Sequence, residues 1–277
     1  MEQVPCIGPA IARWLAYLEL RGKPVTTRRT YQSLLGVLRL STDPLAALDT
    51  TRLHALVLDR YRSQSPATTA TMWAALSSFL TYCREQGWTT QTMHGIPRPV
   101  VTPKPHRYLS KDEIGRILAA AGAHERTMIL LLLIGLRVAE LCAVRWQDYD
   151  PERGEIRVLF TKGNKPRTIA AGRALRAALD AESRTDVRIV ALTTEGVRDR
   201  LRGIGKRARV PGLHPHLFRS TWATHFLIEG GIESRGALKT LGGWSNDRMV
   251  DLYTRSAISD AAVKRAHELD LTDRLLG

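Results

Sequence analysis

Cysteine is scarce in this chain of 277 residues. The three cysteines, Cys6, Cys83 and Cys142, are widely spaced, odd in number and form no CxxC pair. This usage excludes a disulfide framework and a cysteine-based zinc site, and it is typical of a protein in a reducing compartment. We therefore predict a cytoplasmic protein without a structural metal.

Long hydrophobic runs are missing as well. The longest apolar stretch, from Met128 to Leu136, is too short to span a bilayer and is followed directly by Arg137. No N-terminal segment has the charged and then apolar layout of a signal peptide. We expect a buried helix from about Thr127 to Trp146 and no contact with a membrane.

Acidic residues are the third shortage. The chain carries 41 Lys+Arg against 27 Asp+Glu, a formal net charge of +14. Residues 1–100 contribute +5 (11 basic minus 6 acidic), and residues 101–277 contribute +9 (30 minus 21). An excess on both parts indicates a polyanionic partner that touches both, and nucleic acid is the obvious one. Charge alone leaves open a merely soluble basic protein.

What the chain does contain is a succession of helical patterns interrupted by a proline-rich segment. We expect a helical domain over residues 1–95, where four segments show apolar residues at helical spacing and basic residues on their outer faces. These segments are 7–22, 26–40, 50–64 and 68–88. Four prolines within nine residues then disfavour helix and central strand, which predicts an extended linker over 96–108.

Residues 109–277 are expected to form a second domain of mixed α/β type. Ser110 and Glu113 make a capping box at the start of its first helix. Two short β-like runs, 154–160 and 165–171, are joined by the turn-forming letters TKGN, which predicts a hairpin. Helical patterns then continue to the C-terminus. The predicted fold class is therefore mostly α, with a small antiparallel sheet in the second domain.

Two arginines occupy positions suited to holding an anion. Arg137 follows the buried apolar run, with Glu140 one helical turn along; an ion pair within a helix explains this spacing equally well. His216 and Arg219 are three residues apart near a helix start that Pro215 favours, which makes a natural anion site. An ordinary amphipathic surface helix is the plainer interpretation of that second pair.

Lys162, Trp244 and Tyr253 are weak signals when taken one by one. Lys162 lies at the predicted hairpin tip, where a lysine is usually just solvated. Trp244 follows two glycines and precedes Ser245, a candidate N-cap for the helix that holds Tyr253. A tyrosine within a helix normally fills core or surface, so this position by itself indicates no chemistry.

Taken in order, these residues resemble the tyrosine recombinase (phage integrase) family. The resemblance covers roughly Tyr108 to Ala257 and rests on the strings GLRVAEL, TKGNK, HLFRSTWATHF and GWSNDRMVDLYT. Each string is common, whereas their ordered occurrence behind a helical N-terminal module is not. The resemblance implies a core-binding domain over 1–95 and a catalytic domain over 109–277, which together clamp a DNA duplex.

The resemblance also implies a role for each candidate residue. Tyr253 would attack a DNA phosphodiester and form a 3′-phosphotyrosine link. Arg137 and Arg219 would hold the non-bridging oxygens, where planar guanidinium forks strengthen as charge grows. Lys162 would protonate the leaving 5′-oxygen, and His216 would contact the phosphate and assist proton movement at the tyrosine. Neither a metal nor another cofactor is implied.

Two further residues complete the implied site. Trp244 would donate its indole N–H to a phosphate oxygen or support the pocket, and Glu140 would hold Arg137 in place. Many family members, among them the Xer-type resolvases of chromosome dimers, have His at the Trp244 position. We therefore favour an integrase of a phage or other mobile element over an Xer-type resolvase. A type IB topoisomerase and a non-catalytic DNA-binding protein are the remaining alternatives.

The tail from about residue 258 predicts a protomer contact. Its sequence suggests a separate short helix with Ser259 as N-cap and a one-sided apolar stripe. The stripe consists of Ala262, Val263, Ala266 and Leu269. The resemblance implies docking on a neighbouring protomer in a cyclic tetramer on two DNA sites, whereas docking on its own domain is the simpler alternative. A directionality or DNA-bending factor is a further partner to consider.

Overall fold

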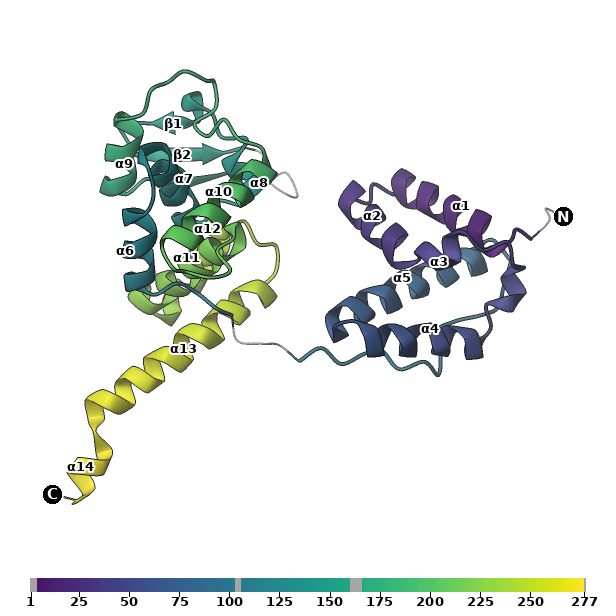
Figure 1. Cartoon of the computed structure of the whole chain (residues 1–277). Coiled ribbons are helices and arrows are strands. Elements are labelled where there is room, and N and C mark those ends of the chain that lie inside the picture. The colour runs from purple at the N-terminus through teal and green to yellow at the C-terminus, as the bar shows by residue number, and fades with distance from the viewer. Residues whose placement is uncertain (1–3, 103–105, 160–165, 277) are drawn as a thin grey trace. The chain divides into compact units, whose positions relative to one another are not determined.

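The computed structural model of the chain describes residues 4–102, 106–159 and 166–276. The chain divides into two compact units, Met1–Lys104 and Pro105–Gly277, which Figure 1 colours purple to blue and teal to yellow. Within the described ranges, no helix is long and apolar enough to cross a membrane. The assignment of the first unit to DNA binding stays a prediction.

The first unit is built from short helices around one apolar core. Trp14 of α1 is fully buried and meets the Phe79 ring of α5 edge to face, with 5.7 Å between the ring centroids. The single helix expected over 26–40 is in fact two, since α2 ends at Leu34 and α3 begins at Gly36. The helices are α1 (Ile7–Leu20), α2 (Val25–Leu34), α3 (Gly36–Arg39), η1 (Leu45–Ala47), α4 (Thr50–Ser63) and α5 (Pro66–Glu85).

The second unit is mostly helical, and its first helix begins as predicted. The Ser110 hydroxyl accepts a hydrogen bond from the Glu113 backbone (3.1 Å), and the Glu113 carboxylate accepts one from the Ser110 backbone (3.0 Å). The helices are α6 (Lys111–Ala119), α7 (Ala123–Leu133), α8 (Val138–Leu141), η2 (Trp146–Asp148), α9 (Arg173–Asp180), α10 (Thr194–Arg207), α11 (Pro215–Gly230), η3 (Ile232–Ser234), α12 (Arg235–Gly242), α13 (Arg248–Leu269) and α14 (Leu271–Leu276).

A small antiparallel sheet accompanies these helices. Its order is β1-β2-β3, with Ile156 opposite Ile169 and Val158 opposite Arg167. Alternate side chains face the core, as a strand period of two requires. The predicted fold class is therefore confirmed, as are the two strands of the predicted hairpin. The strands are β1 (Tyr149–Asp150), β2 (Glu155–Val158) and β3 (Arg167–Ala170).

The long helix expected from Thr127 to Trp146 is wrong in its second half. α7 ends at Leu133, and Gly135 adopts a left-handed backbone (φ +89°). A Cβ at Gly135 would lie 2.4 Å from the Trp222 ring, so the close packing of α11 requires glycine here. The break makes Arg137 the N-cap of α8.

The C-terminal helix also differs from expectation. α13 begins at Arg248 with Asp247 as N-cap, so the predicted N-cap at Ser245 is wrong. The predicted second N-cap at Ser259 is wrong too, because α13 runs without interruption to Leu269. Tyr253 and the first part of the tail thus lie on one helix, which ends the unit together with α14 (Figure 1).

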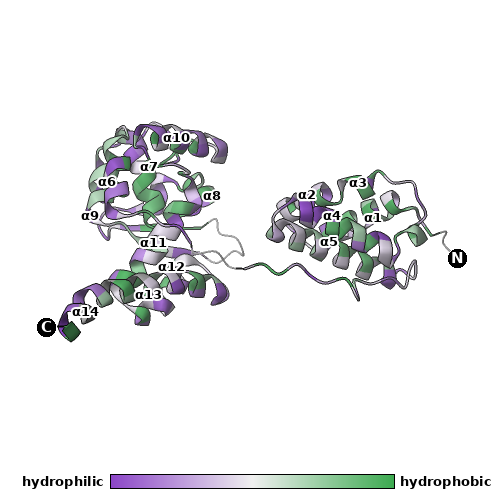
Figure 2. Ribbon diagram, turned by 60° about the horizontal axis from the view of Figure 1, so that its bottom comes forward, coloured by the Kyte–Doolittle hydropathy of each residue, from purple (hydrophilic) through white to green (hydrophobic). Residues whose placement is uncertain are grey.

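Two apolar clusters organise the second unit. The larger one gathers buried side chains from α6 to α11 and the sheet, with α7 at its centre; Figure 2 colours much of α7 as hydrophobic. The smaller one lies between α11, α12 and α13 and contains Leu227, Leu238, Val250 and Tyr253. The tyrosine expected to carry chemistry, which lies on α13, is therefore held by packing against α11 and α12.

Candidate active site

Arg137 lies at the break between α7 and α8 and is partly buried. Its Nη1 donates to Glu140 Oε1 (2.7 Å), and its backbone N–H donates to Glu140 Oε2 (2.8 Å). Its Nη2 donates to the carbonyl oxygens of Gly242 and Gly243, both at 3.1 Å. The contact between Arg137 and Glu140 belongs to a helix cap, and it leaves Nη2 of the guanidinium to reach the C-terminal end of α12.

Sequence reasoning missed a third arginine, Arg167, the first residue of β3. Its Nη1 and Nη2 donate to the two carboxylate oxygens of Glu140 at 2.9 and 2.8 Å. Burial by itself raises the pKa of Glu140, but hydrogen bonds from Arg167 and from the Arg137 backbone hold that pKa below its usual value. The sequence did contain a signal for Arg167. It shares the core-facing side of β3 with Ile169, where a charged residue needs a buried partner.

Arg219 of α11 is almost completely buried, with 3% of its surface exposed. Its guanidinium donates to the carbonyl oxygens of Gly135 and Gly242 and lies 4.6 Å from the centroid of the Trp244 ring. Burial, followed by the nearby charge of Arg137, lowers the pKa of Arg219 to about 9. The side chain therefore remains a cation at neutral pH.

The carbonyl of Gly242 is the point where two arginines converge. Nη2 of Arg137 and Nη2 of Arg219 both donate to this one oxygen. A Cβ at Gly242 would lie 2.2 Å from the Trp244 ring, and Gly243 ends α12 in a left-handed conformation (φ +59°). The two glycines before Trp244 are thus required locally, and the two guanidiniums are placed so that they can share an anionic oxygen.

Tyr253 is fully buried beside these arginines. Its ring centroid lies 5.5 Å from that of Trp244, and its hydroxyl makes no hydrogen bond to a described residue. Burial raises the pKa of Tyr253, while the nearby Ser220 hydroxyl and the charges of Arg219 and Arg137 act in the opposite direction. The same arginines that would hold a phosphate therefore also favour a phenolate.

His216 lies near Tyr253 with a second histidine, His106, in contact with both rings. The ring of His106 lies 6.2 Å from that of His216 and 5.6 Å from that of Tyr253, measured between centroids. Burial, followed by the influence of His106 and His214, lowers the pKa of His216. The His216 imidazole is therefore neutral at pH 7 and able to accept a proton. Sequence reasoning missed His106, which comes from the segment expected to be linker.

The structure thus gathers five of the six predicted catalytic side chains around the Gly242 carbonyl and the Tyr253 ring. The sixth, Lys162, lies outside the described residues. Among the residues that are described, no group of three or more His, Cys, Asp or Glu is placed to hold a metal ion. The expectation of a site without metal or cofactor stays a prediction.

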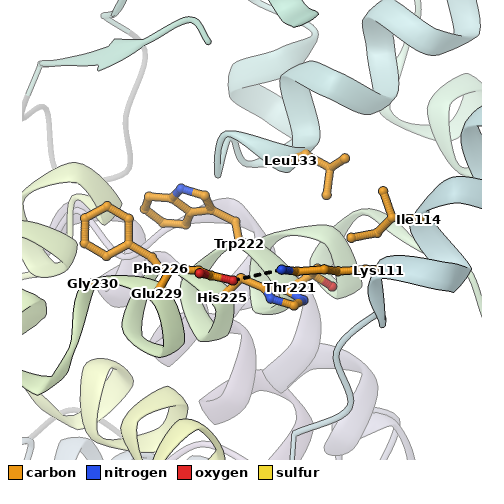
Figure 3. A pocket seen from close by; sticks show the side chains of 9 residues that line it. All are labelled: Lys111, Ile114, Leu133, Thr221, Trp222, His225, Phe226, Glu229 and Gly230. Atoms are coloured by element: carbon orange, nitrogen blue, oxygen red, sulfur yellow. Dashed lines mark ion pairs between the residues drawn. The ribbon is translucent and has the colours of Figure 1, made fainter. Parts of the chain in front are cut away.

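A separate apolar pocket of about 540 Å³ lies between α6, α7 and α11 (Figure 3). Ile114, Leu133 and Phe226 line it, together with Trp222, and none of the predicted catalytic residues does. Lys111 Nζ and Glu229 Oε1 form an ion pair of 3.1 Å among its lining residues. The candidate active site is therefore the arginine cluster, formed by Arg137, Arg167 and Arg219, and not this pocket.

The groups at the arginine cluster are those that a covalent phosphoryl transfer needs. Two guanidiniums converge on one oxygen position, the His106 ring contacts both the phenol and the neutral His216 imidazole, and the phenol is flanked by positive charge. Such donors stabilise the charge that develops on a phosphate in the transition state. The fold and the site together define an enzyme that transfers phosphoryl groups through a tyrosine.

Comparison with known proteins identifies the family to which the chain belongs. Residues 107–259 match the model of the phage integrase family. The tyrosine recombinase XerC of Chromohalobacter salexigens is 32% identical, with 89% of this chain and 90% of the relative covered. XerC of Proteus mirabilis is 28% identical, with 93% and 94% covered. The chain therefore belongs to the phage integrase family of tyrosine recombinases, site-specific enzymes that cleave and rejoin DNA through a phosphotyrosine intermediate.

Solved structures support the fold. A lambda integrase dimer bound to a COC′ core site superposes with a TM-score of 0.74 at 21% identity, covering 88% of this chain and 76% of that one. A lambda integrase tetramer bound to a Holliday junction gives a TM-score of 0.73 at 22% identity, covering 91% and 78%. The mostly helical architecture with a small sheet is thus the fold of the integrases.

Proposed function

We propose that Tyr253 is the nucleophile of this recombinase. Its Oη would attack the scissile phosphorus, the bond from phosphorus to the 5′-oxygen would break, and the 3′-phosphate would stay on the enzyme. The observation that carries this proposal is the position of the phenol beside Arg219 and Arg137, whose charges favour its deprotonated form. The neutral imidazole of His216 would receive the phenol proton through a short relay.

Arg137 and Arg219 would bind the non-bridging oxygens of the same phosphate. Their convergence on the Gly242 carbonyl supports this role, because Nη2 of each guanidinium already donates to the same oxygen. Trp244 would cover the guanidinium of Arg219 and the Tyr253 ring, keeping water from both. Since Tyr253 is fully buried in the chain alone, attack on DNA would require α13 to shift and uncover the phenol.

Lys162 would be the general acid that protonates the departing 5′-oxygen. Lys162→Ala is expected to cleave ordinary DNA about 10²-fold or more slowly, as loss of a general acid does. A substrate with a 5′-bridging sulfur loses a thiolate that needs little protonation, so its cleavage should be largely restored. Single-turnover cleavage of both substrates measures this. Equal defects on both would assign the acid to another group, with Lys165 as the matched variant to test next.

The biological role we propose is integration and excision of a phage or other mobile element in the bacterial cytoplasm. Trp244 supports it, since Xer-type resolvases usually have His there. The similarity to relatives named XerC and XerA favours the alternative of dimer resolution. Double-stranded core or attachment sites would be the substrate in either case, and a directionality or DNA-bending factor would set the direction of a nearly isoenergetic exchange.

We also propose that the active form is a cyclic tetramer held by the tail. On α13 and α14, Ile258, Val263, Leu275 and Leu276 expose between 54% and 83% of their surface, although all are apolar. A head-to-tail ring needs a second, different surface to receive them, and the apolar pocket of Figure 3 is a surface of that kind. Docking in trans would also restrain Tyr253, which lies on the same helix.

A two-site recombination assay and a supercoil-relaxation assay, run in parallel on plasmids, test the proposed activity. A recombinase should exchange two directly repeated sites, whereas a topoisomerase-like enzyme would relax supercoils without exchange, and a non-catalytic protein would do neither.

A chain ending at Ala257 should still bind one half-site but lose cooperative binding, synapsis and recombination. Leu275→Asp with Leu276→Asp is the milder matched variant, because it keeps α13 intact. If either variant recombines like the full chain, the tail does not hold the assembly.

A further inference from the structure

Arg167 makes more interactions at the active site than any role assigned so far requires. It is 9% exposed, and its guanidinium forms a fork with both carboxylate oxygens of Glu140 at 2.9 and 2.8 Å. Its Nε donates to the carbonyl of Leu241 at 2.6 Å. Three donors of one side chain are thus committed to two segments that are distant in sequence.

Glu140 is shared between two arginines. Each of its oxygens accepts twice, from Arg167 and from either the side chain or the backbone of Arg137. The group contains two positive charges and one negative charge, so a net positive charge remains in a place where Glu140 is 3% exposed. Without Arg167, the carboxylate would neutralise Arg137 alone, and the local field toward a phosphate would fall.

The position of Arg167 connects three parts of the proposed site. It pairs with Val158 at the adjoining ends of β2 and β3, the two strands between which Lys162 lies in the sequence. Leu241, its backbone partner, directly precedes the Gly242 carbonyl on which Arg137 and Arg219 converge. A single buried guanidinium therefore links the adjoining ends of β2 and β3, the Arg137 segment and the C-terminal end of α12.

We propose that Arg167 is a positioning residue for strand cleavage. It holds Glu140 and the Leu241 carbonyl so that Arg137 faces the phosphate, and it offsets the charge of Glu140 so that Arg137 remains an effective cation. The inference rests on the proposed role of Arg137. A merely structural salt bridge is the competing explanation, and buried ion pairs are by themselves weak evidence of stabilisation.

A double-mutant cycle separates the two explanations. Arg167→Met should lower the single-turnover cleavage rate at saturating DNA by about 10²-fold, as expected when a phosphate-binding group is displaced, with half-site affinity nearly unchanged. Adding Glu140→Gln removes the carboxylate that Arg167→Met leaves unbalanced, and it should restore at least about 10-fold of the lost rate. Additive losses in the double variant, or a wild-type rate for folded Arg167→Met, would overturn the proposal.

Three controls keep the result decisive. Arg176→Met removes another arginine that donates to a backbone carbonyl, that of Pro151, and should cleave at the wild-type rate. If Arg167→Met does not fold, Arg167→Lys takes its place, with a cleavage loss of about 10-fold expected and a wild-type rate contradicting the inference. Arg137→Ala shows which proposal is wrong if the Arg167 experiment fails. A fully active Arg137→Ala would overturn the proposed phosphate-binding site itself. An inactive Arg137→Ala would mean that only the proposed role of Arg167 is wrong.

Discussion

Tyr253→Phe is expected to abolish the covalent protein–DNA adduct while leaving core-site binding intact. The substitution removes one hydroxyl, which makes no hydrogen bond to a described residue, and keeps the ring that packs against Trp244. Removing a buried hydroxyl without a partner costs the fold little and can stabilise it. Any loss of activity would then reflect chemistry and not unfolding.

A suicide substrate, nicked so that the cleaved end diffuses away, measures this adduct on a denaturing gel. Tyr149→Phe is the matched control, because Tyr149 is also a buried tyrosine of the second unit, 6% exposed, and lies on β1 outside the arginine cluster. It should form adduct like the wild type. An adduct that persists in Tyr253→Phe would show that another group is the nucleophile.

Arg219→Ala is expected to slow cleavage by about 10³-fold or more, because a transition-state anion loses a charged, preorganised donor in a buried site. The same change leaves the Gly135 carbonyl without this donor, which costs about 1–3 kcal/mol for one unsatisfied group, whereas the Gly242 carbonyl still accepts from Arg137. A lower free energy of unfolding is therefore expected as well, and the two effects must be measured separately.

Arg219→Lys separates stability from catalysis. It keeps a positive charge near the Trp244 ring but lacks the planar fork that serves Gly135 and Gly242 at once. We expect a cleavage rate between those of wild type and Arg219→Ala. Urea unfolding and half-site binding give the folded fraction, and single-turnover cleavage is corrected for it. A folded Arg219→Ala that cleaves within a few-fold of wild type would remove Arg219 from the proposed mechanism.

Much of the architecture follows from local sequence alone. The helical first unit, the capping box at Ser110, the two strands of the hairpin and the start of α11 at Pro215 were all predicted. Each depends on residues close together in the chain: a periodic apolar pattern, a cap three residues from its partner, or proline at a first helical turn. The ordered strings around Arg137, His216 and Tyr253 likewise indicate the family from the sequence alone.

The helix breaks were decided by tertiary packing. α7 ends at Leu133 although the apolar pattern continues to Leu136. Gly135 is a local stop signal, and the ring of Trp222, from α11, fills the space where any other residue would carry a side chain. Conversely, α13 continues through Ser259, because a serine is only a potential cap and the helical hydrogen bonds around it are already satisfied. Local signals indicate several possible helix ends, and contacts between helices determine which of them are used.

The partners of the charged residues also lay beyond the reach of the sequence. Glu140 was paired with Arg137 because three residues separate them, but its second partner, Arg167, is 27 positions away and comes from a strand. His106 reaches the Tyr253 ring from a segment whose composition predicts only a linker. The sequence by itself determined which side chains are available for phosphoryl transfer. Only the folded chain decided which of them share a buried oxygen, because burial and long-range pairing arise when distant segments pack.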